Sequence, residues 1–220
     1  INFNNKGKRM KKLLVAISAI ILSASSAYSD AKVGVSVTGF EFDSAKGTEE
    51  SKGVVTNRTE TLAMAIGSIF VETSVLDMVS IGLDYVPYAL EGETVTNTRR
   101  ADTGAKSHDD QFSVDIENHT TLYVLLPLGD AGAFIKAGVS HAEVTVNENM
   151  NSSQSYSDEE ILGGHLSIGV ERDMGPVFVR GTVGMSTYET AESESSTGNT
   201  RVKAALGDGV HAGITIGRSF

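Results

Sequence analysis

Residues 159–172, EEILGGHLSIGVER, alternate between apolar and other side chains with a period of two. One face carries Leu162, Leu166, Ile168 and Val170, and the other carries a histidine, a serine, glycine and a glutamate. This period is typical of a β-strand, because successive side chains point to opposite faces. A face of Gly and Ser with rare charges suits a crowded interior better than a surface in water. We therefore expect the apolar face to point outward, toward lipid.

Seven further segments repeat this pattern at about the length that a tilted membrane strand needs, ~10 residues. They are residues 32–42, 60–73, 78–88, 117–128, 133–146, 177–189 and 200–220. The connections alternate in length. Tight turns rich in Asp, Gly and Pro lie at Asp77, 129–132 and 173–176, whereas 43–59, 89–116, 147–158 and 190–199 are long and polar.

Short turns at one end and long loops at the other are the pattern of an outer-membrane barrel. The sequence thus predicts an all-β fold, an eight-stranded antiparallel up-and-down transmembrane β-barrel with short periplasmic turns and long extracellular loops. A soluble sandwich gives no reason for the alternation.

The N-terminus is typical of an export signal. Met10, Lys11 and Lys12 precede an uncharged apolar run over residues 13–22, which is too short to cross a bilayer. Small residues follow, and cleavage after Ala27 or after Ser29 fits them. We expect residues 1–29 to be an upstream extension plus a cleavable signal peptide, and residues 30–220 to be the outer-membrane barrel.

The charge and composition exclude several classes of protein. The first 29 residues carry five basic side chains and no acidic one, so residues 30–220 hold 13 Lys and Arg against 28 Asp and Glu. This negative surplus argues against a nucleic-acid partner. The absence of Cys excludes disulfides, a thiol nucleophile, a Cys-ligated metal and a lipoprotein anchor.

Aromatic residues lie near the predicted strand ends. Phe70, Phe134 and Phe178 lie beside the three turns, and Phe220 is the last residue. These four rings predict an aromatic girdle at the periplasmic interface. Another group lies toward the loop side: Phe40, Tyr85, Tyr88 and Tyr188.

The signal, the eight strands, the alternating loops and the C-terminal GITIGRSF, residues 213–220, resemble the OmpA-like and opacity-protein (OmpX-like) small outer-membrane barrels of Gram-negative bacteria. The resemblance covers the chain after the signal. It implies that Ile214, Ile216 and Phe220 form a C-terminal assembly signal read by the barrel-assembly machinery. Arg218 stands where the family usually has an aromatic residue, although an arginine at the membrane edge can snorkel.

Several polar residues share the inward parity. They are Asp84, Lys136, His165, Glu171, Arg180 and His211. We expect a lumen ion cluster of Asp84, Lys136, Glu171 and Arg180, with the Glu171 carboxylate between Lys136 and Arg180. Buried charges are tolerated only when paired, so structural packing of a narrow interior is favoured over a gate or weak pore.

An enzymatic interpretation finds little support. His165 and Ser167 have the His-x-Ser spacing of outer-membrane lipid A deacylases, with Glu171 or Glu189 as a third member, but their parity turns them away from lipid. Two His without Cys or carboxylate at ligand spacing do not make a metal site. No GxSxG, P-loop or HExxH motif is present. We expect no catalytic role, no metal and no cofactor.

The remaining expectation is a structural or surface-interaction role, in envelope integrity or adhesion, carried by acidic extracellular loops. The longest loop carries charges of both signs: Glu91, Glu93, Arg99, Arg100, Asp102, Lys106, His108, Asp109 and Asp110. Outer-membrane lipid, lipopolysaccharide bridged through divalent cations, and a cell-surface or phage partner are the candidate contacts, and a solvated surface without a ligand is equally compatible. Two alternatives stay open: a narrow porin and a periplasmic lipid-binding barrel.

Overall fold

The computed structural model describes residues 31–51, 54–76, 79–92, 95–99, 108–149, 156–196 and 200–220. The predicted signal peptide and the turn residue Asp77 lie outside these ranges. Within them, eleven β-strands belong to one antiparallel sheet. No helix in the same ranges has the length and apolar character to cross a membrane.

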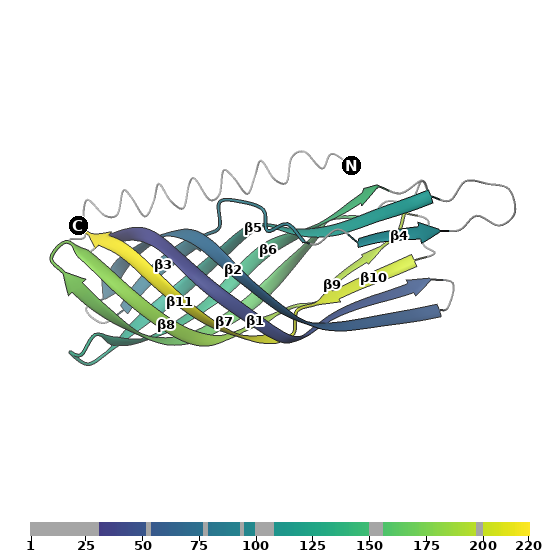
Figure 1. The fold of residues 1–220 in the computed structure, drawn as a ribbon. Coiled ribbons are helices and arrows are strands. Elements are labelled where there is room, and N and C mark those ends of the chain that lie inside the picture. The colour runs from purple at the N-terminus through teal and green to yellow at the C-terminus, as the bar shows by residue number, and fades with distance from the viewer. Residues whose placement is uncertain are drawn as a thin grey trace, which may run out of the picture.

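Eight strands close the sheet into a barrel (Figure 1). They are β1 (Ala31–Ser51), β2 (Val54–Leu76), β3 (Val79–Tyr85), β5 (His108–Leu128), β6 (Ala133–Asn149), β7 (Glu159–Met174), β8 (Val177–Tyr188) and β11 (Asp208–Ser219). Each pairs with its neighbours along the chain, and β1 closes the ring against β11 from Lys32↔Ser219 to Phe42↔Gly209. The predicted eight-stranded up-and-down barrel is confirmed.

The short connections lie at one end of the barrel. The turn over residues 129–132 uses Gly129 and Gly132 at φ 68° and 76°, and the β7–β8 turn uses Gly175 at φ 71°. These left-handed conformations favour glycine because a Cβ would clash with the backbone. The C-terminus lies at this same end (Figure 1), where the Phe220 amide donates to the Ala31 carbonyl.

Where the structure describes them, most residues of the predicted polar loops are in β-strands, which corrects the sequence-based expectation. The β1–β2 hairpin continues to Ser51↔Val54 and the β5–β6 hairpin to Gln111↔Asn149. Three short strands extend this part: β4 (Val95–Arg99), β9 (Ala191–Glu194) and β10 (Thr200–Ala205). The polar composition indicated only that these segments face water. It did not predict strands, because hydrogen bonds to a neighbouring strand are what hold the segments extended.

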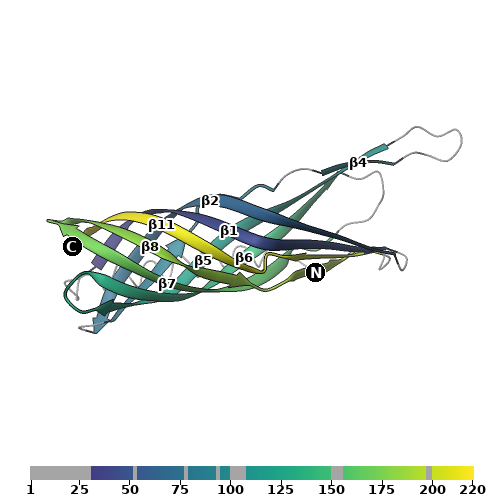
Figure 2. The same cartoon turned by 60° about the horizontal axis from the view of Figure 1, so that its bottom comes forward.

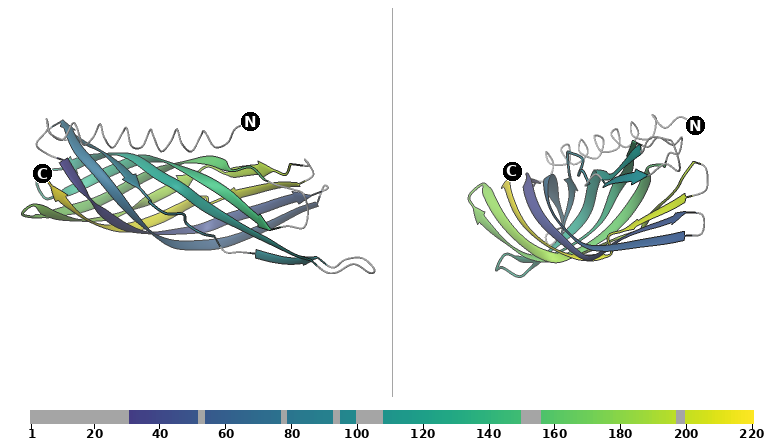
Figure 3. Two further views of the ribbon diagram at one scale, coloured as in Figure 1. Left: turned by 90° about the horizontal axis from the view of Figure 1, so that it is seen from above. Right: turned by 45° about the vertical axis from the view of Figure 1, so that its right-hand side comes forward.

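These extensions form arms beyond the barrel (Figures 1 and 2). The strand β10 pairs with the far half of β1, and β9 pairs with β10, so both lie beside the β1–β2 arm, as Figure 3 shows. The last predicted strand, residues 200–220, is therefore interrupted between β10 and β11, where Gly207 has φ 72°.

An apolar belt surrounds the outside of the barrel. On β7 the outward face is apolar from Leu162 to Val170 and is bounded by the exposed Glu160 and Arg172. This span matches a tilted membrane strand of about 9–11 residues. Exposed apolar residues on the other strands include Val35, Val37, Ile69, Leu122, Val124, Leu126, Val139, Val183, Met185, Val210, Ile214 and Ile216. The predicted parity of the strands is thus confirmed.

The predicted aromatic girdle at the turn end is wrong for three of its four rings. Phe70, Phe134 and Phe178 are only 4%, 2% and 0% exposed and point into the lumen, whereas Phe220 is exposed. The sequence held the signal for this orientation, because each buried ring stands two residues from an inward-facing charged residue and therefore shares its face.

Buried rings pack directly on glycines of neighbouring strands. A Cβ on Gly82 would lie within 2.6 Å of the Tyr123 ring, and one on Gly169 within 2.4 Å of Phe134. Glycine at these positions lets large rings fill a narrow barrel. The same relation holds for Gly217 with Phe178, Gly209 with Phe42 and Gly163 with Tyr188.

The substitution Gly82→Ala should lower the free energy of unfolding by about 1–3 kcal/mol, the usual cost of overpacking. The added methyl group displaces Tyr123, which is fully packed. Urea unfolding in detergent measures the change, and Gly181→Ala is the matched control because a Cβ there meets nothing within 4 Å. Equal stabilities of the two variants would contradict this account of the glycines.

Candidate functional site

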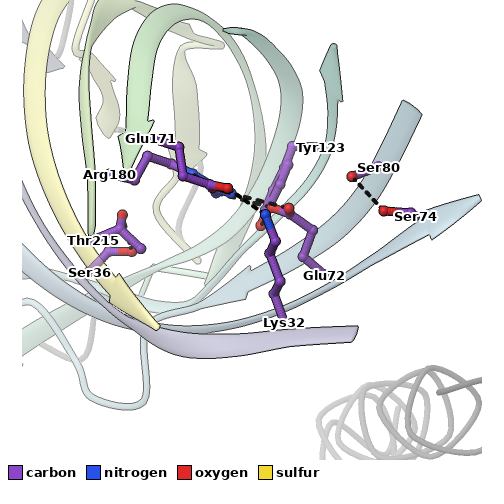
Figure 4. A network of polar contacts seen from close by, with 9 residues as sticks. All are labelled: Lys32, Ser36, Glu72, Ser74, Ser80, Tyr123, Glu171, Arg180 and Thr215. Carbon is purple, nitrogen blue, oxygen red and sulfur yellow. Dashed lines mark hydrogen bonds and ion pairs between the residues drawn. The ribbon is translucent and has the colours of Figure 1, made fainter. Parts of the chain in front are cut away.

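Four charged side chains form an ion network across the lumen near the turn end (Figure 4). Arg180 on β8 binds Glu72 on β2 through two hydrogen bonds of 3.0 and 3.1 Å, and its Nε lies 3.0 Å from the Glu171 carboxylate. Lys32 donates to the other oxygen of Glu171 at 2.5 Å. Two cations and two carboxylates balance, as buried charges require.

Further groups hold the Arg180–Glu72 pair in place. The Tyr123 hydroxyl donates to Glu72 at 2.9 Å. The Arg180 guanidinium carbon lies 5.1 Å from the centroid of Phe134 and 5.2 Å from that of Phe178, distances at which a ring face attracts a cation. The arginine is 3% exposed and the glutamate 1%. These contacts close the turn end of the lumen.

The structure brings together two of the four residues of the predicted ion cluster. Glu171 contacts Arg180, but its second cation is Lys32 and not Lys136. Lys136 instead lies 3.9 Å from the centroid of the Tyr123 ring, and it lines a cavity with Asp84. The predicted Lys136–Glu171–Arg180 arrangement is therefore not what the structure holds.

Sequence reasoning missed Lys32 and Glu72. Both occupy inward-facing positions. Lys32 is the second residue of β1, and Glu72 follows Phe70 by two residues on β2. Their parity was readable from the sequence. Their meeting was not, because it depends on which strands oppose each other across the closed barrel.

Above the ion network lies a cavity of about 70 Å³, which we call the central chamber. Its polar lining comprises Asp84, His119, Lys136, His165, Ser167 and His211, with several threonines. The inward placement predicted for Asp84, Lys136, His165 and His211 agrees with this lining. The chamber is large enough for a few water molecules, since one needs roughly 10–15 Å³ of such space.

An apolar layer, the outer seal, separates the chamber from the arms. It consists of Phe40, Phe42, Met64, Ile116, Tyr188 and Leu206, around a remaining space of about 20 Å³. The rings of Phe40 and Phe42 stack with centroids 6.2 Å apart, and Tyr188 packs edge-on to Phe42. The described lumen is therefore closed on both sides of the central chamber.

His165 and Ser167 do not pair with each other. His165 bonds to Ser140 and Ser186, and Ser167 bonds to His211 at 2.8 Å. All of these groups face the closed lumen. The arrangement lacks the access that a deacylase needs to reach an acyl chain.

The arms are held together by packing on their inner side and by charge pairs on their outer side. Ala142, Val144, Ile161 and Ala191 form a buried cluster between β6, β7 and β9. On the outer side Lys203 donates to Glu192 at 2.8 Å, and this hydrogen bond holds the pKa of the Glu192 carboxyl below its usual value. The arms thus have a core of their own.

Much of the predicted loop chemistry lies outside the described residues. Glu93, Arg100, Asp102 and Lys106 fall there. A second set, Arg99, His108, Asp109 and Asp110, belongs to the backbone ladder between β4 and β5. Glu91 is exposed just before this segment.

The residues of the predicted C-terminal assembly signal share the outward side. Ile214 and Ile216 are exposed on β11, and Phe220 is exposed at its end. The guanidinium of Arg218 lies 5.2 Å from the Phe220 ring centroid. Recognition of these residues by assembly machinery stays a prediction.

No protein-family model and no curated protein matches the sequence. Among solved structures, the chain is similar to the outer-membrane protease OmpT of Escherichia coli, with 7% identity, 87% of this chain and 97% of that chain covered, and a TM-score of 0.47. For Ail, the attachment invasion locus protein of Yersinia pestis, the values are 7%, 87%, 99% and 0.38.

A third similar structure is Neisserial surface protein A, at 12% identity, with 84% of this chain and 97% of that chain covered and a TM-score of 0.36. At such identities the likeness concerns the fold alone.

Proposed function

We propose that this chain is a non-catalytic outer-membrane β-barrel that conducts no solute and acts through its β-structured extracellular arms, in envelope integrity or adhesion. The observation that carries the proposal is the closed lumen, with the ion network on one side of the central chamber and the outer seal on the other. A closed interior leaves the arms and the outer wall as the surfaces that other molecules can reach.

The outward apolar belt supports placement in a membrane. Exposed Leu, Ile and Val side chains cover the wall over the height of a membrane strand, which a protein in water would avoid. The same observation disfavours the periplasmic lipid-binding alternative, because a soluble barrel turns its apolar residues toward the lumen.

The arms suit a role in surface contacts. Their β-pairing gives them fixed edges and faces. Exposed ion pairs line their outer side, such as Arg58–Glu60 along β2 and Arg201–Glu192 between β10 and β9. Such pairs add little stability but present charge of both signs to lipopolysaccharide, to its bridging divalent cations or to another cell surface.

Planar-bilayer conductance separates this proposal from the porin alternative. Residues 30–220, refolded in detergent and inserted in a bilayer, should give no steady channels, while a heat-modifiable gel shift reports the folded barrel. Steady channels from the folded protein would instead favour the narrow porin. A mature domain that stays monomeric in buffer without detergent would contradict the membrane assignment itself.

A further inference from the structure

A chain of hydrogen bonds crosses five strands inside the barrel. His165 lies in it with Nε2 at 2.5 Å from the Ser140 hydroxyl and Nδ1 at 2.8 Å from the Ser186 hydroxyl. Ser186 continues to His211 Nδ1 at 2.7 Å. We call this the hydroxyl–imidazole chain, and its members in order are Thr121, Ser140, His165, Ser186, His211 and Ser167.

The chain is satisfied when both imidazoles are neutral. A neutral ring has one donor and one acceptor nitrogen, and each nitrogen of His165 and His211 meets a hydroxyl group. The Ser186 hydroxyl joins the two Nδ1 atoms with a single proton, so it donates to one ring and accepts from the other. If both rings were protonated, Ser186 would face two donors.

Added protons would bring unpaired charge into the interior. In the described chain no hydrogen bond of His165 or His211 goes to a carboxylate. The titratable groups that face these rings from the other strands are Asp84 on β3, His119 on β5, Lys136 on β6 and Tyr188 on β8; Phe40 on β1 and Ile66 and Ser68 on β2 complete the surroundings. Asp84 and Lys136 line the same cavity and attract each other as opposite charges. A further buried charge without a partner is costly.

A third imidazole lies beside the hydroxyl–imidazole chain. His119 lines the same chamber, and its Nδ1 is buried without a hydrogen-bond partner in the described chain, while its Nε2 lies 3.0 Å from the Tyr188 hydroxyl. His119 is not a member of the hydroxyl–imidazole chain, and the proposal assigns it no proton.

The His165 and His211 rings contact the outer seal. The Phe40 ring centroid lies 5.4 Å from that of His211 and 6.5 Å from that of His165, and Tyr188 lies 5.5 Å from His165. An imidazolium requires water, and the rings of Phe40 and Tyr188 are what exclude it on the arm side. Charge on the imidazoles therefore acts directly on the seal.

We propose that the lumen is acid-sensitive: protons taken up by His165 and His211 charge the hydroxyl–imidazole chain and open the central chamber to water. Histidine is the side chain whose ordinary titration falls in the range, about pH 5–8, where such a change would occur. The proposal goes beyond the surface role of the arms and would stand even if that role proved wrong.

The absence of cysteine from the sequence permits a direct test. Thr38→Cys places a thiol in the chamber lining, and Thr59→Cys places one on the exposed arm. The folded variants are labelled in detergent with a small charged thiosulfonate reagent at about pH 8 and about pH 5.5, bracketing ordinary imidazole titration. At each pH, the labelling rate of Thr38→Cys is divided by that of Thr59→Cys. This ratio cancels the intrinsic pH dependence of thiol reactivity.

We expect this ratio to rise about tenfold or more at the lower pH, since linkage contributes a factor of ten per pH unit for each proton taken up. In the background His165→Gln plus His211→Gln the ratio should stay flat, because an amide can bond to hydroxyls but takes up no proton. His141→Gln, at a ring that faces outward toward Glu160, should behave as the wild type.

A flat ratio in the wild type would overturn the proposal, and so would a rise that persists in the double variant, because carboxylates of the ion network would then be responsible. If the double variant gives no heat-modifiable band, His211→Gln alone replaces it. The urea midpoint of the wild type at the two pH values provides a second measurement, and equal midpoints would equally reject acid sensitivity.

Discussion

Replacing Arg180 by alanine should lower the free energy of unfolding by about 3–5 kcal/mol, the cost of leaving a buried charge without its partner. Glu72 would remain in the lumen at 1% exposure, and among the described residues only the Tyr123 hydroxyl would still donate to it. Glu171 would keep Lys32 as its partner, so its lost contact with Arg180 contributes the smaller part of the decrease in the free energy of unfolding. Urea unfolding of the refolded barrel, followed by the heat-modifiable gel shift, measures the change.

The double variant Arg180→Met plus Glu72→Gln is the control for this prediction. It removes both charges together and keeps an acceptor for Tyr123, and replacing a buried pair by neutral groups is often close to neutral in stability. We expect it to recover most of the loss. If Arg180→Ala alone is as stable as the wild type, the ion network does not hold the turn end closed.

The second large effect is expected on the outer wall. The substitution Leu166→Arg should lower stability in phospholipid vesicles by about 2–4 kcal/mol, the cost of arginine near the bilayer midplane. Leu166 is 60% exposed on β7, midway between the bounding Glu160 and Arg172. The penalty comes from placing the charge in lipid and not from lost packing, since the side chain packs little against the protein.

Val55→Arg is the matched control because Val55 is 54% exposed on the β1–β2 arm, outside the apolar belt. An exposed site in water should change by no more than about 0.5 kcal/mol. Unfolding by denaturant in vesicles gives both values. Equal losses for the two variants would show that the belt does not face lipid, and the transmembrane assignment would then be wrong.

The regular alternation of the strands explains why the barrel itself could be predicted. Between residues 162 and 171 of β7, the inward residues are Gly, Ser, His or Glu and the outward ones are mainly Leu, Ile or Val. Strand, face and number of crossings therefore follow from the local pattern. Gly129, Gly132 and Gly175 likewise mark their turns through a local requirement for positive φ.

The arms show where local composition misleads. Residues 43–51 and 54–59 have few apolar side chains and were expected as loop. From residue 45 onward they nevertheless pair as the β1–β2 arm, after a register shift between Phe42 and Ala45. Their extended conformation is decided by hydrogen bonds to another strand, which composition does not encode. The girdle prediction for Phe70, Phe134 and Phe178 was wrong for another reason. Their parity placed them inward, but their position at the strand ends suggested a girdle.

By itself, the sequence predicted export. It determined an acidic chain with eight amphipathic strands and the face on which each strand residue lies, because these properties depend on neighbours within a few residues. Only the tertiary structure decided that Arg180 takes Glu72 as its partner, that Lys32 replaces Lys136 beside Glu171, and that His165 and His211 join through Ser186. The register around a closed barrel and the contacts across its lumen join residues far apart in the chain, and no local pattern specifies them.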